Sequence, residues 1–412
     1  MNKETLKIVL AGHVDHGKST LIGRLLLDTK SLPKGKLQDI KKVSKSFGRE
    51  TELAYLSDQL KEERQRNMTI DTTEIFIKTP RRHYALIDTP GHLEFIKNML
   101  TGAARAEAAI LLIDAREGIR EQTFRHAYLL KFLSIRDILV VVNKMDLLDY
   151  DRKSFYHVST GIATLMASLG LEARHIIPVA AKKGDGIVKK SPRMPWYQGP
   201  SLLEAMAECR LPSVAHLTSL RLPVQDVLKM DGRSMILGRI ASGALKQRQK
   251  VQIMPARAAA EVAAINVYPR SRREARRPEN IALVLSPDVP ARRGDIMVDA
   301  NDTPALTSSF HGNIFWMGQD PLRRYDEVTL HVATQIIPAR VQQISQKMDP
   351  ANLQILESEA RLLDHHQTAL IRFEMDNPVV LETHADLPEL GRYVLKKQEQ
   401  ILGIGTVLEK YP

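Results

Sequence analysis

The chain has 412 residues, which exceeds what one hydrophobic core usually supports, so its length predicts two or three domains. With 43% hydrophobic and 26% charged residues it has an ordinary globular composition, and its only cysteine, Cys209, excludes an internal disulfide and a zinc site built on several cysteines. The 59 basic and 48 acidic residues give a formal net charge of +11, which favours polyanionic or acidic partners without choosing among them.

The apolar segments are too short to cross a membrane. The N-terminus passes from polar residues directly into a short strand and lacks the pattern of a signal peptide. The longest apolar runs, AAILLI and ILVVV, fall far below the roughly 20 residues that a spanning helix needs. We therefore predict a cytoplasmic protein without a membrane partner.

The first half of the chain alternates short β-branched runs with segments of helical spacing. The predicted strands cover residues 6–12, 73–79, 83–89, 108–115, 138–146 and 175–181. Between them, residues 19–30 and 93–105 have apolar positions at helical intervals. This alternation predicts an α/β domain over residues 1–211, with a mostly parallel sheet covered on both faces.

The second half consists of short alternating runs separated by turn residues, which is typical of antiparallel barrels. In a first β domain over residues 212–301, the predicted strands are 222–230, 234–243, 249–254, 261–268, 281–286 and 295–300. In a second β domain over residues 302–412, they are 312–317, 325–333, 339–346, 368–375, 377–382, 391–397 and 401–410. We therefore expect two antiparallel β-barrels after the α/β domain.

A phosphate-binding motif lies between the first predicted strand and the first predicted helix. Gly12, Gly17 and the pair Lys18–Ser19 match the P-loop pattern G-x-x-x-x-G-K-[ST]. The glycines let main-chain N–H groups surround a phosphate, Lys18 reaches the outer phosphates, and Ser19 ligates magnesium. The motif predicts a bound nucleoside triphosphate. Its predicted contacts are Gly12, His13, Val14, Asp15, His16, Gly17, Lys18, Ser19 and Thr20.

A second motif predicts which base the site binds. Asn143, Lys144 and Asp146 follow a buried predicted strand, and an aspartate can accept two hydrogen bonds from the N1–H and exocyclic amine of guanine. The segment VAAKKGDG, residues 179–186, then looks like a loop that presents the main-chain N–H of Ala181 to the guanine carbonyl. The residues predicted at the base are Asn143, Lys144, Asp146, Ala180, Ala181 and Lys182. Together the motifs predict a GTP and Mg²⁺ site in a P-loop GTPase domain.

The segment LIDTPGHLEF supplies the remaining predicted groups. Asp88 ends a strand and can hold magnesium through water, and the Gly91 N–H can contact a terminal phosphate. We predict that His92, directly after DTPG, positions the attacking water. Upstream, Thr69 offers a hydroxyl that closes over magnesium in the triphosphate state and is released on hydrolysis. The predicted catalytic residues are His92, Lys18 and Thr69, and the predicted metal ligands are Ser19, Thr69 and Asp88.

The motifs GHVDHGKS, MTID, DTPGH and NKMD, in this order and followed by two β domains, resemble the translation-factor class of GTPases. The phosphate loop is most similar to that of elongation factor Tu and its archaeal and eukaryotic counterpart. Other stretches, including SPRMPWYQGPSLLEAM, GRIASGAL and NPVVLE, resemble the GTPase subunit of bacterial sulfate adenylyltransferase.

These two resemblances imply different functions. The second implies a regulatory GTPase that assists a separate small catalytic ATP sulfurylase subunit in making adenosine 5′-phosphosulfate, and the many local likenesses make it our leading hypothesis. The first implies a translational GTPase that carries aminoacyl-tRNA and acts with tRNA or the ribosome; the positive charge and GHVDHGKS favour it. A GTPase switch for another assembly is a third hypothesis.

Three positions depart from the sulfate-enzyme family. That family usually has VDDGKS, whereas His16 follows the elongation factors. Its R-G-I-T-I becomes Arg66 to Ile70, with Met68 offering a more flexible apolar gate before His92. Ala180 replaces the usual serine of the guanine loop, which removes a hydroxyl worth about 1 kcal/mol as one hydrogen bond.

A basic loop interrupts the first β domain. The stretch YPRSRREARRP could bind RNA phosphate or an acidic partner, or it could be a solvated hairpin, because no aromatic residues are interleaved as a platform for bases. Its arginines are Arg270, Arg272, Arg273, Arg276 and Arg277. The sequence leaves both interpretations open.

Overall fold

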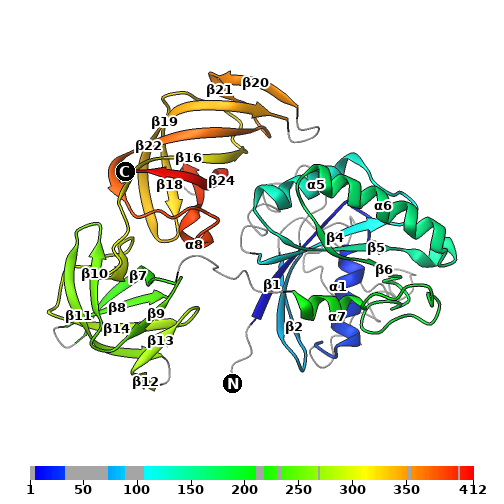
Figure 1. The fold of residues 1–412 in the computed structure, drawn as a ribbon, viewed down its shortest axis with the longest axis horizontal. Coiled ribbons are helices and arrows are strands. Elements are labelled where there is room, and N and C mark those ends of the chain that lie inside the picture. Colours follow the sequence, from blue (N-terminus) through cyan, green and yellow to red (C-terminus); the bar gives the residue numbers. More distant parts are fainter. Residues whose placement is uncertain are drawn as a thin grey trace, which may run out of the picture. The chain divides into compact units, whose positions relative to one another are not determined.

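The computed structural model describes residues 5–32, 73–88, 106–209, 218–230, 233–267, 270–349, 354–397 and 400–412. The chain divides into two compact units, Met1–Pro212 and Ser213–Pro412 (Figure 1). Of the residues predicted to act in the site, Thr69, Gly91 and His92 lie outside the described ranges, as does the predicted helix 93–105.

The first unit is built on one sheet in the order β2-β3-β1-β4-β5-β6. Its strands are β1 (Thr5–Gly12), β2 (Thr73–Lys78), β3 (His83–Asp88), β4 (Ala108–Asp114), β5 (Asp137–Asn143) and β6 (Ala173–Pro178). Every pairing is parallel except β2 with β3, which form an antiparallel hairpin. The predicted mostly parallel sheet is therefore confirmed.

Helices cover both faces of this sheet, as its nearly continuous apolar strands require. They are α1 (Lys18–Asp28), α5 (Glu121–Phe132), α6 (Arg152–Ser168) and α7 (Leu202–Glu208), with a 3₁₀ turn, η3 (Met145–Leu148). Ile8, Leu112 and Val141 pack in one apolar cluster with α1 and α7. The alternate positions along these strands are also buried, and Figure 1 shows α5 and α6 on the opposite face.

The parallel strands bring three polar residues at strand ends, Asp88, Asp114 and Asn143, to one edge of the sheet beside the end of β1. Leu10 of β1 pairs with Asp88, and Asp114 of β4 pairs with Asn143 of β5. In open α/β sheets, ligands bind outside the carboxyl ends of the strands. The register thus places the ends of β1, β3, β4 and β5 where a ligand site is expected.

Two closed antiparallel barrels form the second unit, as predicted. The first runs β10-β15-β7-β8-β14-β11 and closes through β10 with β11, while β12 extends β11 and β9 pairs with β13. Its strands are β7 (Arg221–Met230), β8 (Arg233–Arg239), β9 (Ala244–Lys246), β10 (Lys250–Met254), β11 (Ala258–Val267), β12 (Arg270–Arg272), β13 (Glu274–Arg276), β14 (Asn280–Ser286) and β15 (Ile296–Asp299).

The second barrel runs β18-β23-β24-β16-β22-β19 and closes through β18 with β19, with β20 added to β19 and a ribbon of β17 and β21. Its elements are β16 (Thr307–Trp316), β17 (Leu322–Arg323), β18 (Glu327–Val332), β19 (Gln335–Met348), β20 (Ile355–Ala360), β21 (Leu362–Leu363), β22 (Thr368–Val379), α8 (Pro388–Gly391), β23 (Arg392–Lys397) and β24 (Gln400–Tyr411). The strands expected at 368–375 and 377–382 differ from the structure, because β22 continues through Asn377 and Pro378 as far as Val379.

The two barrels share a buried contact within their unit. Arg221 of β7 donates to Glu382 at 2.9 Å, and both side chains are almost fully buried. Apolar residues of both barrels, including Met254, Val298 and Leu390, pack in one cluster beside this pair. Removing one partner alone would leave the other charge buried without compensation, at a cost of about 3–5 kcal/mol, so the contact between the barrels needs both Arg221 and Glu382.

Within the described ranges, no helix is both long enough and apolar enough to cross a bilayer.

Candidate functional site

The phosphate loop depends on glycine at both ends. Gly12 has φ +151°, and a Cβ there would lie 2.6 Å from the carbonyl oxygen of Leu112 in β4. Gly17 has φ +94°, and its Cβ would lie 2.6 Å from Nδ2 of Asn143 at the end of β5. A side chain at either position would therefore push the loop away from the neighbouring strand ends, while α1 begins directly after Gly17.

Lys18 lies inside the loop and folds back on its carbonyl groups. Its Nζ donates to the carbonyl oxygens of Gly12 at 2.7 Å and His13 at 3.0 Å. Burial lowers the pKa of Lys18 from 10.5 to about 8, although Asp88 and Asp15 favour the charged form. The ammonium group is thus poorly compensated without an anion, which makes an anionic ligand at this position favourable.

Ser19 and Asp88 bring oxygen ligands to the same loop. The Ser19 hydroxyl donates to Oδ2 of Asp88 at 3.4 Å, and Asp88 is 1% exposed at the end of β3. Hydroxyl and carboxylate oxygens are the hard ligands that Mg²⁺ prefers. The donor set therefore fits a magnesium ion beside the phosphate loop.

The side chain of His16 is directed into the domain. Its Nδ1 lies 3.1 Å from the carbonyl oxygen of Leu112, and its Nε2 lies 3.5 Å from Glu117. Burial lowers the pKa of His16, against the contrary effects of Leu112 and Glu117. His16 therefore supports the loop from beneath, and its main chain forms part of the loop.

Asn143 joins the phosphate loop to the predicted guanine loop. Its Nδ2 donates to the carbonyl oxygen of His16 at 2.8 Å, and its Oδ1 accepts from the N–H of Ala181 at 3.0 Å. In this structure the Ala181 amide, predicted to contact the guanine carbonyl, thus bonds to Asn143. One buried side chain fixes the spacing between the two loops.

Lys144 is held by a residue that sequence reasoning did not single out. Its Nζ lies 2.8 Å from Oδ2 of the buried Asp114. Burial raises the pKa of Asp114, but hydrogen bonds from Lys144 and from the Arg116 N–H outweigh burial and lower it overall. Asp114 lies at the end of a predicted apolar strand, as Asp88 and Asn143 do, and this position could have indicated from the sequence that it belongs to the site. Asp146 follows in η3, half-buried.

Arg24 is a second residue that the sequence did not reveal. From α1 it donates to the carbonyl oxygens of Ala181 at 3.2 Å and Lys182 at 2.6 Å. Asp28, one turn further along α1, lies 3.6 Å from the same guanidinium. The contact joins residues more than 150 positions apart, so no local pattern could indicate it.

The described residues of the predicted site converge at the carboxyl edge of the sheet. The phosphate loop, Asp88 and the base motif meet there through Asn143. The predicted contacts Val14, Asp15 and Thr20 lie within the loop and the first turn of α1, and Ala180 lies beside Ala181. The individual roles of all these residues remain predictions.

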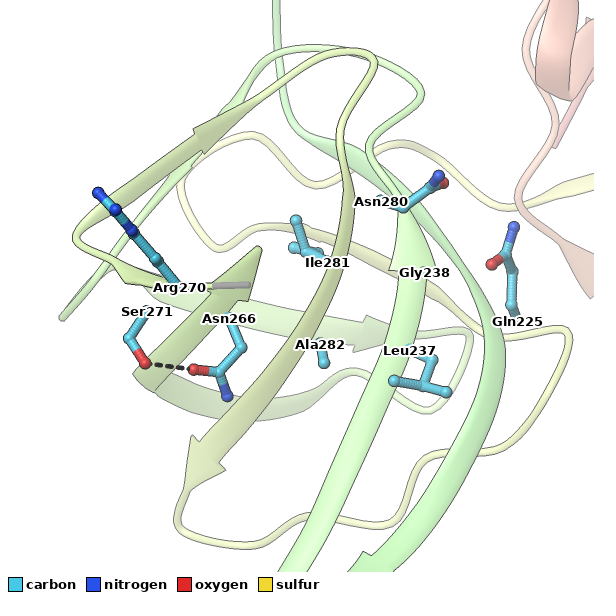
Figure 2. A pocket seen from close by; sticks show the side chains of 9 residues that line it. All are labelled: Gln225, Leu237, Gly238, Asn266, Arg270, Ser271, Asn280, Ile281 and Ala282. Atoms are coloured by element: carbon cyan, nitrogen blue, oxygen red, sulfur yellow. Dashed lines mark hydrogen bonds between the residues drawn. The ribbon is translucent and has the colours of Figure 1, made fainter. Parts of the chain in front are cut away.

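The first barrel, in the second unit, has a hollow of its own. The cavity has a volume of about 480 Å³, and at its wall Ser271 donates to Asn266 at 2.6 Å. Figure 2 shows that the side chain of Arg270 extends away from Leu237 and Ala282. Its lining residues are Gln225, Leu237, Gly238, Asn266, Arg270, Ser271, Asn280, Ile281 and Ala282.

The basic loop beside this hollow is partly neutralised. Three of its arginines pair with glutamates: Arg272 with Glu279 at 2.7 Å, Arg276 with Glu274 at 3.0 Å, and Arg277 with Glu389 at 3.2 Å. Among the described residues, Arg270 and Arg273 form no ion pair. The charge available to a partner is therefore concentrated on these two side chains.

Fold and site together define a P-loop protein of the translation-factor class. Residues 3–212 match the Elongation factor Tu GTP binding domain, and residues 309–408 match the GTP-eEF1A C-terminal domain-like family. The chain belongs to the family of elongation factor Tu and elongation factor 1-alpha.

Relatives named elongation factor 1-alpha match along the full length. The protein of Aeropyrum pernix is 36% identical, with 100% of this chain and 98% of the relative covered. That of Archaeoglobus fulgidus is 35% identical, with 100% and 99% covered. A solved structure of sup35 complexed with GDP covers 100% of this chain and 95% of its own, at 21% identity and a TM-score of 0.47.

The leading hypothesis from the sequence, a GTPase subunit of sulfate adenylyltransferase with a small ATP sulfurylase partner, is wrong. It rested on local likenesses, most of them in the β domains, whereas the relatives that match along the full length are named elongation factor 1-alpha. The structure explains the error in GRIASGAL: a Cβ on Gly238 would lie 2.8 Å from the carbonyl oxygen of Pro223, and Gly243 has φ +73°. These glycines are required by the barrel, so the likeness reports its packing and carries no information about a partner.

Proposed function

We propose that this chain is a translational GTPase that binds aminoacyl-tRNA in its GTP form and releases it after hydrolysis. The observation that carries the proposal is the full-length match to proteins named elongation factor 1-alpha, at 34–36% identity through both barrels. The convergence of the phosphate loop and the base motif at one sheet edge supports it. The proposal includes a cytoplasmic location.

GTP and Mg²⁺ are the ligands that the residues fit. Lys18, freed from the loop carbonyls, would meet the outer phosphates, and Asp146 would accept from the N1–H and amine of guanine. Ser19, Asp88 and Thr69 are the residues that would hold Mg²⁺, which when bound neutralises phosphate charge.

For hydrolysis, we assign to His92 the positioning of the attacking water. The sequence carries this assignment, since His92 follows DTPG at the end of the strand that carries Asp88. His92→Ala should leave GTP affinity unchanged and slow single-turnover hydrolysis by about 10²–10⁴-fold, the usual contribution of a positioned acid or base. His157→Ala, on the exposed side of α6, is the matched control. Unchanged turnover in His92→Ala would remove His92 from this role.

The hollow of the first barrel is our candidate for the end of the tRNA. Asn266, Asn280 and Gln225 can hydrogen-bond to ribose or base edges, and Leu237 offers an apolar surface. Arg270 extends outward, where it can meet a phosphate. Arg270→Glu should therefore weaken tRNA binding while GTP binding stays unchanged.

The decisive experiment measures protection of the ester bond. Aminoacyl-tRNA is incubated with the protein loaded with a non-hydrolysable GTP analogue, and spontaneous deacylation is followed over time. We expect slow deacylation with the GTP analogue and fast deacylation with GDP. Equal rates in both states would contradict the tRNA function, and GTP hydrolysis without any protection would favour a switch for another assembly.

A further inference from the structure

A hydrogen-bonded network lies next to the base motif and takes no part in the contacts described above. The Tyr150 hydroxyl donates to Oδ2 of Asp185 at 2.7 Å, and Nη1 of Arg193 donates to the Tyr150 oxygen at 2.8 Å. Nε1 of Trp196 donates to the Tyr150 main-chain oxygen at 3.1 Å. Two segments distant in sequence thus hold both ends of one tyrosine.

The turn that carries Asp146 is held in a strained conformation. Lys144, Asp149 and Tyr150 have φ of +65°, +50° and +59°, a region that residues other than glycine avoid. Each such residue costs on the order of 1–3 kcal/mol, so the turn persists only where its surroundings impose it. Lys144 is held by Asp114 on one side of Asp146, and Tyr150 is held by the network on the other.

Asp185 links this turn to the guanine loop. Its main-chain oxygen accepts from the N–H of Ala180 at 3.1 Å, at the start of the Ala180 to Lys182 segment. Its Oδ1 accepts from the Ser191 hydroxyl at 2.7 Å, which ties it to the segment that carries Arg193. Asp185 therefore couples both elements predicted to read the base, because its side chain holds Tyr150 and its main-chain oxygen holds Ala180.

The segment that carries Arg193 and Trp196 is itself anchored on α6. The Trp196 ring lies 5.3 Å from the ring of Phe155, and the Tyr197 ring lies 6.0 Å from it. Phe155 is buried, so the segment has a fixed base against which it can support Tyr150.

We propose that Tyr150, Asp185, Arg193 and Trp196 form a brace that positions Asp146 and the guanine loop, and thereby sets base selectivity and the rate of nucleotide dissociation. The inference rests on the proposed binding of guanine nucleotides. These are positioning residues, because they act on the base through Asp146 and Ala181.

A merely structural role makes a different prediction from a positioning role. General loosening of the domain lowers the affinity for every nucleotide in the same proportion. Loss of positioning lowers the affinity for GDP more than that for IDP, because inosine lacks the exocyclic amine that Asp146 is predicted to bind. The ratio of the two affinities therefore isolates the brace from general stability.

The test compares Tyr150→Phe and Asp185→Asn with the unchanged chain. Affinities for GDP and IDP and the dissociation rate of a fluorescent GDP are measured, with thermal melts as a check of folding. We expect a wild-type preference for GDP of about tenfold or more to fall about threefold in each variant, and GDP dissociation to accelerate several-fold. Tyr156→Phe is the matched control: its ring also contacts Trp196, at 6.3 Å, but among the described residues its hydroxyl has no hydrogen bond to Asp185.

Two results would overturn the brace, and they differ in meaning. If the ratio of GDP affinity to IDP affinity in Tyr150→Phe equals that of the unchanged chain, the brace is contradicted and the guanine site is not. A wild-type chain without preference for GDP over IDP or ADP removes the guanine site itself, and the brace with it. If Asp185→Asn does not fold, Tyr150→Phe and Trp196→Phe, which removes one donor to Tyr150, decide the question.

Discussion

The two ends of the nucleotide site are built in different ways. At the phosphate end, main-chain groups and glycines hold the conformation. Lys18 bonds to the carbonyls of Gly12 and His13, and Gly17 leaves room for Asn143. At the base end, side chains hold the conformation, with Lys144 on Asp114 and Tyr150 on Asp185. The phosphate end is thus specified by a short local pattern, and the base end by contacts between distant segments.

This difference separates affinity from selectivity. Phosphates are common to all nucleotides, so a change at the phosphate end should alter binding of every nucleotide alike. We predict that the base is read only at the other end, so a change there should alter the ratio between nucleotide affinities. Each prediction below tests one side of that division.

The largest effect should come from Lys18→Ala. It removes the ammonium group that is predicted to meet the phosphates, and charge-assisted hydrogen bonds are stronger than neutral ones, so we expect affinity for GTP and ITP to fall about 100-fold or more. Titration calorimetry measures both. The ratio of the two affinities should stay unchanged, and Lys183→Ala, an exposed lysine of the guanine loop, should leave both as they are. A changed ratio would contradict the division between the two ends.

Asp146→Asn should invert base preference with little effect on the phosphates. An asparagine can donate to the 2-carbonyl of xanthine but repels the guanine amine, so GTP affinity should fall about tenfold to 100-fold while XTP affinity rises. Competition between XTP and GTP for a fluorescent nucleotide gives the ratio. Retained preference for GTP would show that Asp146 does not read the base.

The pKa of Lys18 predicts how phosphate binding changes with pH. Below about pH 8 the group is already charged, so GTP affinity should be constant; above it, affinity should fall by up to about tenfold per pH unit, because binding must then take up a proton. In the unliganded protein, the same pKa makes the free energy of unfolding change with pH in the opposite direction to the affinity for GTP. Between about pH 8 and 10.5 the unfolded chain binds more protons at Lys18, so this group makes the free energy of unfolding rise with pH.

Calorimetry in buffers of different ionisation enthalpy measures the proton uptake directly. Lys18→Ala should abolish both the uptake and the pH dependence of binding. A GTP affinity that stays constant from pH 7 to 9.5 would show that the charge of Lys18 does not contribute to GTP binding.

The smallest effect should come from Arg24→Ala, which cuts the contact of α1 with the carbonyls of Ala181 and Lys182. Because Arg24 acts only through main-chain carbonyls of the guanine loop and is not itself a predicted ligand contact, we expect GDP dissociation to accelerate only about two- to fivefold, the effect of losing an ordinary hydrogen bond. Stopped-flow release of a fluorescent GDP measures it. An effect as large as that of Asp146→Asn would mean that α1 controls the base end.

The sequence allowed the sheet, the barrels and the phosphate loop to be predicted because each depends on local patterns. Glycine at positions 12 and 17 followed from the P-loop pattern, and the structure adds the reason, which is the approach of Leu112 and Asn143. Short local sequence similarities did not predict the partner correctly. GRIASGAL reflects what a barrel turn requires, so it could not distinguish two functions that share the barrel.

By itself, the sequence determined the α/β domain followed by two barrels and the translation-factor class, and it supplied the ligand contacts that remain predictions. Only the tertiary structure decided how the base motif is held, through Arg24, Asp114, Asp185 and the packing of Trp196 on Phe155. The physical reason is the range of the interactions. A glycine requirement or a strand period acts within a few residues, whereas a buried side chain bonds to whatever the fold brings beside it.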